Sequence, residues 1–120
     1  MNTSSQGALA EERTARYLSD KGYHILARNF HATGGEIDIV AFYNKILIFV
    51  EVKERASEDF GGPIMAVTHA KQKRIAQAAL QFIKMNKNIS HNTIRFDVVC
   101  ILPKGIEHIE NAFVPIRTTL

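Results

Sequence analysis

The sequence predicts an α/β fold: a mixed β-sheet flanked by helices, with elements in the order α-β-β-β-α-β-β. Three observations support this prediction. Two stretches carry apolar residues at the three- and four-residue spacing of amphipathic helices. Two segments on either side of a short polar break alternate apolar and polar residues, as half-buried strands do. Helices that interleave with strands favour a sheet with helices packed against it.

Each element has its own boundary signals. Gly22 is expected to end the first helix, and Thr68 is expected to cap the second. The strand at 93–102 is strongly apolar, which predicts a central position in the sheet. In chain order we expect a helix at 7–21, strands at 23–30, 36–42 and 46–55, a loop at 56–63, a helix that follows Thr68, and strands at 93–102 and 106–114.

The most informative stretch is a hairpin whose two strands both carry acids. If 44–45 forms a two-residue loop, the register places Asp38 opposite Glu51 and Glu36 opposite Lys53. A three-residue loop would shift the pairing by one position and leave Asp38 to meet the other strand diagonally. Glu51 and Lys53 share a face in either register, because they are two residues apart. Opposed carboxylates repel unless a cation lies between them, so the pattern predicts a divalent metal site.

The composition narrows the class of function. A chain of 120 residues suffices for one hydrophobic core, so we expect a single domain at 1–120. No apolar run is long enough to span a bilayer and no leader is apparent, so we expect no membrane partner. Cys100, the one cysteine, lies in an apolar strand and favours a reducing, cytoplasmic setting. The net charge of +3 permits a polyanionic partner.

Other common catalytic patterns are missing from the sequence. The five histidines lack metal-ligand spacing, and there is no glycine-rich phosphate loop or nucleophile elbow. Aromatic residues are few and most read as core, which argues against a base-stacking surface. The acidic hairpin is therefore the strongest candidate site.

Glu11 is an unexpected acid on the inward stripe of the first helix. The stripe also contains Ala8, Ala15 and Leu18. A carboxylate in such a position needs a hydrogen bond, an ionic partner or a metal. Two interpretations are equally supported: Glu11 pairs with an arginine such as Arg28, or it points into the same cleft as Asp38.

These residues carry a family resemblance. Asp38 followed by Glu51-x-Lys53, with a helical acid upstream, resembles the restriction-endonuclease-like core known as PD-(D/E)xK. Nearly the whole chain resembles the YraN family of small bacterial proteins, which is similar in fold and motif to Holliday-junction resolvases. The matching stretches are 15–18, 22–30, 34–38, 49–55, 60–61, 95–99 and 111–113, together with Glu11, Val67 and Lys71.

The resemblance implies a Mg²⁺-dependent (or Mn²⁺-dependent) nuclease that hydrolyses phosphodiester bonds in DNA, with branched DNA as a candidate substrate. Asp38 and Glu51 would supply the oxygen ligands of the ion, and the backbone carbonyl of Val52 would add another. Glu11 would reach a second metal or a water bound to the ion. Lys53 would orient the attacking water or stabilise the developing negative charge.

Basic residues outside the hairpin suggest where a nucleic acid would lie. Lys71, Arg55 and Arg28 are expected to line a basic approach to phosphates. Lys73 and Arg74 are interpreted instead as part of a solvated helix face.

A few positions are less regular. His31 stands where the resembling proteins usually carry a basic residue such as arginine, so a phosphate contact there would be weaker and dependent on pH. Ala10 stands just before Glu11, where the resembling proteins frequently carry a glycine. Glu36 suits either the site or a salt bridge to Lys53. Asp97 is interpreted as a structural ion-pair partner.

Three functions are consistent with the sequence. The first is the metal-dependent nuclease. The second is a non-catalytic nucleic-acid-binding or protein-interaction module that keeps the nuclease fold, and the third is a structural protein whose acids and lysine form an ion-pair network. A homodimer is a further prediction for the first, because a four-way junction presents two equivalent strands.

Overall fold

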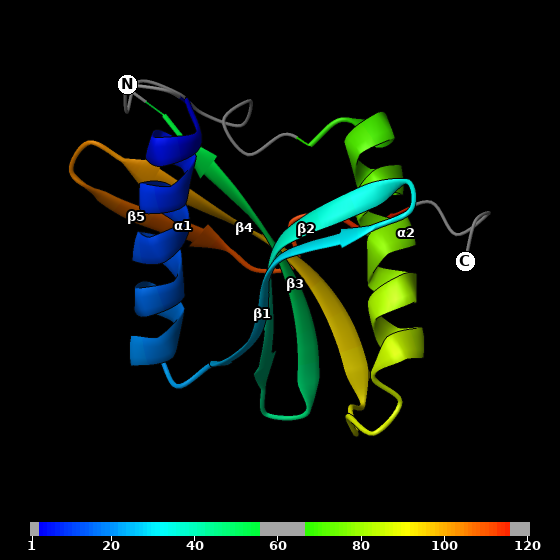
Figure 1. Cartoon of the computed structure of the whole chain (residues 1–120). Coiled ribbons are helices and arrows are strands. Elements are labelled where there is room, and N and C mark those ends of the chain that lie inside the picture. Colours follow the sequence, from blue (N-terminus) through cyan, green and yellow to red (C-terminus); the bar gives the residue numbers. More distant parts are fainter. Residues whose placement is uncertain (1–2, 56–66, 116–120) are drawn as a thin grey trace.

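The computed structural model describes residues 3–55 and 67–115, which form one mixed sheet and two helices (Figure 1). The elements follow the predicted order, so the predicted fold class is confirmed, and the arrangement is consistent with a restriction-endonuclease-like core. The bounds are α1 (Thr3–Asp20), β1 (His24–Ala32), β2 (Gly35–Tyr43), β3 (Ile46–Glu54), α2 (His69–Met85), β4 (Thr93–Leu102) and β5 (Gly105–Ile109).

The five strands lie in the order β1-β2-β3-β4-β5. Neighbouring strands are antiparallel except β3 and β4, which run parallel because α2 connects them. The predicted two-residue loop between β2 and β3 is confirmed. Asn44 and Lys45 both adopt positive φ angles of 52° and 65°, as a hairpin turn of type I′ requires. Tyr43 then pairs with Ile46, and the predicted register holds as far as Ile39 opposite Val50.

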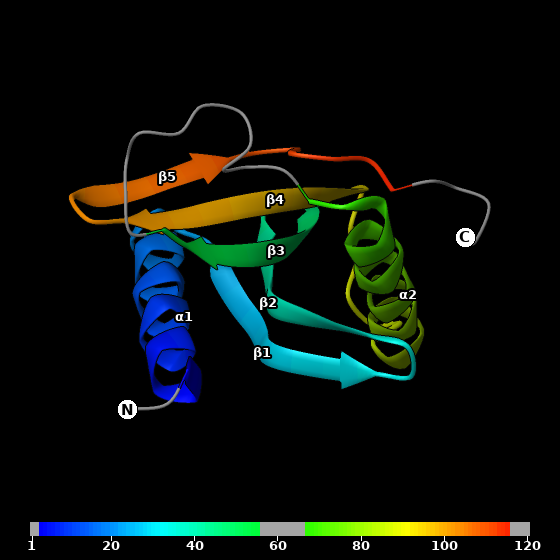
Figure 2. The same ribbon diagram turned by 90° about the horizontal axis from the view of Figure 1, so that it is seen from above.

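Alternating side chains of β2 and β3 belong to two separate hydrophobic cores. Ile39, Ile48 and Val50 pack with α1, whereas Val40, Leu47 and Phe49 pack with α2. The two helices stand apart in both views, and β1 and β2 pass between them (Figure 2). Each helix therefore has its own apolar face of the sheet, which fixes where residues of α1 and α2 meet the hairpin.

The predicted boundaries hold to within about two residues except that α1 begins at Thr3 instead of 7 and that the last strand ends early. Thr68 caps α2 as expected, since its side chain accepts a hydrogen bond from the Lys71 N–H at 3.1 Å. The strand expected at 93–102 is confirmed, but β3 is the middle strand and β4 lies beside it. The last strand ends at Ile109 instead of 114, because Asn111 takes a positive φ of 54° and its N–H bonds Asp97. The loop predicted at 56–63 lies outside the described residues.

Two further expectations concern the core and the membrane. Cys100 is fully buried in β4, which fits its interpretation as a small core residue. Within the described part of the chain, neither helix has the length and apolar character needed to cross a membrane.

Candidate functional site

The candidate site lies where β2 and β3 separate. Their pairing ends at Ile39 opposite Val50, so Asp38 does not continue the ladder opposite Glu51 as the register predicted. The carboxylate of Asp38 instead enters the fork between the strands, where its Oδ2 accepts a hydrogen bond of 2.8 Å from the Val52 N–H. The structure brings Asp38 against β3 as predicted, but the Asp38 side chain, and not its backbone, accepts the hydrogen bond from Val52.

A kink in β1 accompanies this fork. Asn29 adopts a positive φ of 52° in the middle of the strand, between the residues that pair with Ile37 and Ile39. Ile37 packs with α2 and Ile39 with α1, although alternate residues of a regular strand share a face. The hairpin therefore turns at the level of Asp38. The sequence signal for this kink was an asparagine in a strand, since asparagine tolerates positive φ better than most residues.

Asp38 and Glu51 form a pair of acids with too little positive charge around them. Burial, and then the charge of Asp38, raise the pKa of Glu51 to about 7. Burial also raises the pKa of Asp38, against the opposing effects of the Val52 N–H and the Lys71 charge. The Lys71 ammonium group lies 3.4 Å from Glu51 Oε2. The pair would therefore gain energy from an additional cation.

Glu11 satisfies both of the interpretations considered for it. The residue is 7% exposed, and its Oε1 accepts hydrogen bonds from Arg28 Nε at 3.1 Å and Asn29 Nδ2 at 2.9 Å. It also faces the same cavity as Asp38. This cavity of about 240 Å³ is lined by Gly7, Ala10, Glu11, Asp38, Val52 and Glu54.

The donor set of this cavity fits a hard cation such as Mg²⁺. Among residues 3–55 and 67–115, no three His, Cys, Asp or Glu side chains converge closely enough to hold a metal by themselves. Mg²⁺ does not require such a cage, because it keeps several waters and is commonly bound by one or two carboxylates. Asp38 provides one carboxylate in the wall of the cavity, where Val52 lies beside it, and Glu51 provides the second from outside the lining, next to Asp38.

The predicted cations differ in how strongly they are already engaged. Lys53 follows Glu51 on the α2-facing side of β3, and its positive charge lowers the pKa of Glu51. Within the described residues, it makes no ion pair. Arg28 pairs with Glu11 and, at 2.8 Å, with Glu12, so two carboxylates already engage its guanidinium. Arg55 donates a hydrogen bond of 2.9 Å from Nη1 to the carbonyl of Glu54.

Asp97 forms a separate buried cluster on the α1 side of the sheet. Its carboxylate accepts hydrogen bonds from Arg95 Nε at 2.8 Å and from the Asn111 N–H at 2.9 Å. His108 Nε2 lies 2.8 Å from the other oxygen. The interpretation of Asp97 as a structural ion-pair partner is confirmed.

Glu36 does not form the predicted salt bridge with Lys53, although its charge helps to raise the pKa of Asp38. Its Oε1 lies 3.5 Å from His31 Nδ1, the pair being exposed, and the structure shows no salt bridge between Glu36 and Lys53. It faces a second pocket, of about 370 Å³, that sequence reasoning missed. This pocket is lined by His31, Ala32, Gly35, Glu36, Lys71 and Arg74.

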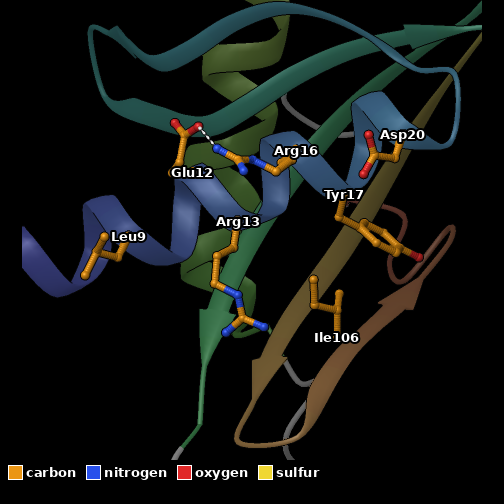
Figure 3. Close-up of a pocket in the computed structure, with 7 residues that line it drawn as sticks. All are labelled: Leu9, Glu12, Arg13, Arg16, Tyr17, Asp20 and Ile106. Carbon is orange, nitrogen blue, oxygen red and sulfur yellow. Dashed lines mark ion pairs between the residues drawn. The ribbon is translucent and has the colours of Figure 1, made fainter.

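A third concavity lies away from these acids. A groove of about 580 Å³ runs along the outer face of α1 and is lined by Leu9, Glu12, Arg13, Arg16, Tyr17, Asp20 and Ile106 (Figure 3). Leu9, Tyr17 and Ile106 form its apolar part, while Arg16 is paired with Glu12 at 3.7 Å. We assign this groove no part in the chemistry of Asp38 and Glu51.

The comparisons with known proteins agree on one family. The profile of the Uncharacterised protein family UPF0102 matches residues 10–101. A UPF0102 protein of Lachnoclostridium phytofermentans is 45% identical over 113 residues, covering 94% of this chain and 96% of the relative. A UPF0102 protein of Dictyoglomus turgidum is 44% identical over 119 residues, covering 94% of this chain and all of the relative. The candidate site residues from Glu11 to Lys71 lie inside the matched region.

Proposed function

This chain belongs to the uncharacterised protein family UPF0102, the YraN family, and on that premise we propose that it is a Mg²⁺- or Mn²⁺-dependent nuclease acting on DNA. One observation supports the proposal above all others. Two partly buried carboxylates, Asp38 and Glu51, lie together in a strand fork with raised pKa values, and Lys53 follows Glu51 on the same strand. Perturbed acids of this kind, in a cavity with a neighbouring lysine, are typical of active sites.

Each residue has a separate task in this proposal. Asp38 and Glu51 hold the cation, with the carbonyl of Val52 as the additional ligand that the PD-(D/E)xK resemblance implies. A bound divalent cation supplies Lewis-acid activation of water and neutralises charge on the phosphate. Lys53 donates a hydrogen bond from its ammonium group to the attacking water or to the phosphate oxygen that gains negative charge.

The main role of Glu11 in this proposal is to hold α1 and β1 in place. Because its Oε1 is held by Arg28 and Asn29, it fixes α1 against the kinked part of β1. Its cavity-facing side also adds negative charge near Asp38, which favours a second cation or a water bound to the first. Arg28 and Arg55 donate hydrogen bonds to the cavity residues Glu11 and Glu54, and their charges contribute to the approach of a polyanion.

The setting and assembly are part of the same proposal. A cytoplasmic location fits a buried, unpaired Cys100. A homodimer would place two cavities against the two equivalent strands of a branched substrate. Light scattering of the purified protein, with and without a four-way junction, tests this assembly.

The first test is a cleavage assay with labelled linear, flapped and four-way-junction DNA in Mg²⁺ and Mn²⁺. Asp38→Asn and Glu51→Gln keep the side-chain shape and remove the charge, so each should lower the rate by at least about 100-fold. Glu107→Gln, an exposed acid on β5, is the matched control and should cut like the parent.

The opposite outcomes are equally informative. Cutting that survives both substitutions would come from a contaminating nuclease. No cutting, with no heat of Mn²⁺ binding in calorimetry, would overturn the proposal. DNA binding without cutting would favour the non-catalytic nucleic-acid-binding module.

A further inference from the structure

The second pocket is connected to the acid pair of Asp38 and Glu51 through one residue, Lys71. Lys71 contacts Glu51 at 3.4 Å and also lines the pocket formed with His31 and Arg74. The same lysine therefore connects the acid pair on one side with a mainly basic pocket on the other. A polyanion that reached Glu51 would pass this pocket.

The pocket is a consequence of how the hairpin docks on α2. A Cβ atom on Gly35 would overlap the carbonyl oxygen of Arg74, so only glycine permits this close approach of the two backbones. The contact places the end of the β1–β2 hairpin, with His31 and Glu36, against the first turns of α2. The pocket that this contact helps to form has a volume of about 370 Å³.

The charge in the pocket favours an anion. Its lining contains the basic side chains of Lys71, Arg74 and His31. Glu36 is the one acid in the lining; it is about half exposed and lies 3.5 Å from His31. The basic groups outnumber the acid, and arginine is well suited to bidentate contact with phosphate.

We propose that the pocket formed by His31, Lys71 and Arg74 binds a phosphate of the nucleic-acid backbone next to the phosphate cleaved at Asp38 and Glu51. This rests on the proposed nuclease function and adds a binding subsite to it. It changes the interpretation of Arg74, which the sequence alone had assigned to a solvated helix face. It also gives Glu36 a role, since its charge opposes the phosphate and weakens binding.

Affinity for a short fluorescent DNA strand tests the subsite. Binding is measured by anisotropy in Ca²⁺, which takes the same kind of oxygen ligands as Mg²⁺. Arg74→Ala should weaken binding about three- to tenfold and reduce the slope of log affinity against log salt by about one. Lys73→Ala, which removes the same charge from a neighbouring exposed position, is the control and should change both quantities little. Glu36→Gln should strengthen binding.

A neutral backbone linkage locates the contact. DNA strands that each carry one methylphosphonate, moved along the chain one linkage at a time, should lose affinity for the parent protein at one particular linkage. The Arg74→Ala protein should show no further loss at that linkage. Competition with inorganic phosphate separates a backbone site from a site for a free anion, because a free-anion site would be saturated by phosphate alone.

The outcomes separate the subsite from the nuclease. Equal losses in Arg74→Ala and Lys73→Ala, or no linkage-specific effect, would overturn the subsite while metal-dependent cleavage leaves the nuclease intact. Lower cleavage with unchanged DNA affinity in Glu36→Gln would mean that Glu36 serves the metal site, and would also overturn it. Arg74-dependent binding without any cleavage would refute the nuclease and retain the phosphate pocket. A parent protein that neither binds nor cleaves DNA refutes both.

Discussion

Asp97 is a fully buried carboxylate and the Asp38–Glu51 pair is partly buried, and their surroundings have opposite effects on the carboxylate pKa values. Burial alone would raise the pKa of Asp97, but hydrogen bonds from His108, Arg95 and the Asn111 N–H hold it below its ordinary value. The acids of the pair keep raised pKa values. Asp97 is therefore matched by donors that the chain itself supplies, and it ties β4 to β5 and to the turn that follows β5.

The difference indicates which cluster is built for structure and which for binding. A carboxylate with a full set of partners gains nothing from an added cation, whereas two neighbouring carboxylates with one lysine contact do. Functional sites commonly keep such unfavourable arrangements at a cost in stability. The contrast can be tested by removing charge from each cluster in turn.

The largest expected effect is on the structural cluster. Asp97→Ala would remove the 2.8 Å ion pair of the partly buried Arg95 guanidinium, leave it only the 3.6 Å ion pair with the more exposed Glu110, and leave the Asn111 N–H without its acceptor. We expect the free energy of unfolding to fall by about 3–5 kcal/mol, as for other broken buried pairs. Urea denaturation measures it. A loss below about 1 kcal/mol would show that water replaces the carboxylate easily, which would weaken the comparison.

The opposite sign is expected at the acid pair. The pKa of Glu51 is about 7 when folded against an ordinary 4.5. Its contribution to stability is therefore present below about pH 4.5 and is lost as the pH rises through about 7. Glu51→Gln should stabilise the protein at about pH 8, by up to about 3 kcal/mol, and this gain should vanish near about pH 4.

Urea titrations of Glu51→Gln and its parent at several pH values measure this gain. Glu107→Gln is the control, because its acid is exposed on β5. Stabilisation that does not change with pH would mean that the gain comes from packing and not from the removed charge.

The two clusters also differ in how far the sequence could predict them. The register of the hairpin, the shared face of Glu51 and Lys53, and the cap at Thr68 follow from local rules, and they were predicted. The fork was not, because it depends on the left-handed Asn29 in another strand. The role of Arg74 depends on the close approach of Gly35 to its backbone, and no local pattern shows which helix a hairpin will touch.

A metal ion should remove the difference between the clusters. Mn²⁺ at about 100 times its dissociation constant should raise the free energy of unfolding of the parent by about 2.7 kcal/mol, since the ion binds the folded state. Asp38→Asn should abolish this gain, and Asp97→Asn should lower the baseline stability but keep it. Thermal unfolding with and without Mn²⁺ measures both. Equal gains in the parent and in Asp38→Asn would place the ion elsewhere.

The smallest expected effect concerns Lys71, which is the nearest substitute for a cation in the acid pair. Its charge lowers the pKa of both Glu51 and Asp38, so it favours the ionised acids that a metal needs, but it also competes with the metal for Glu51. Lys71→Met should therefore weaken Mn²⁺ binding at about pH 6, where Glu51 becomes protonated, and strengthen it at about pH 8, where Glu51 stays ionised. Each change should be at most about fivefold, because the lysine is partly exposed.

Calorimetric titration of Mn²⁺ at the two pH values measures this reversal, with Lys73→Met as the control of equal charge. If Lys71→Met weakens binding at both pH values, the lysine supports the metal site throughout and does not compete with it. If the affinity changes at neither pH value, the 3.4 Å contact between Lys71 and Glu51 contributes no measurable free energy in solution. Only an effect of opposite sign on Mn²⁺ affinity at the two pH values would show that Lys71 acts as the cation beside Asp38 and Glu51 when no metal is bound.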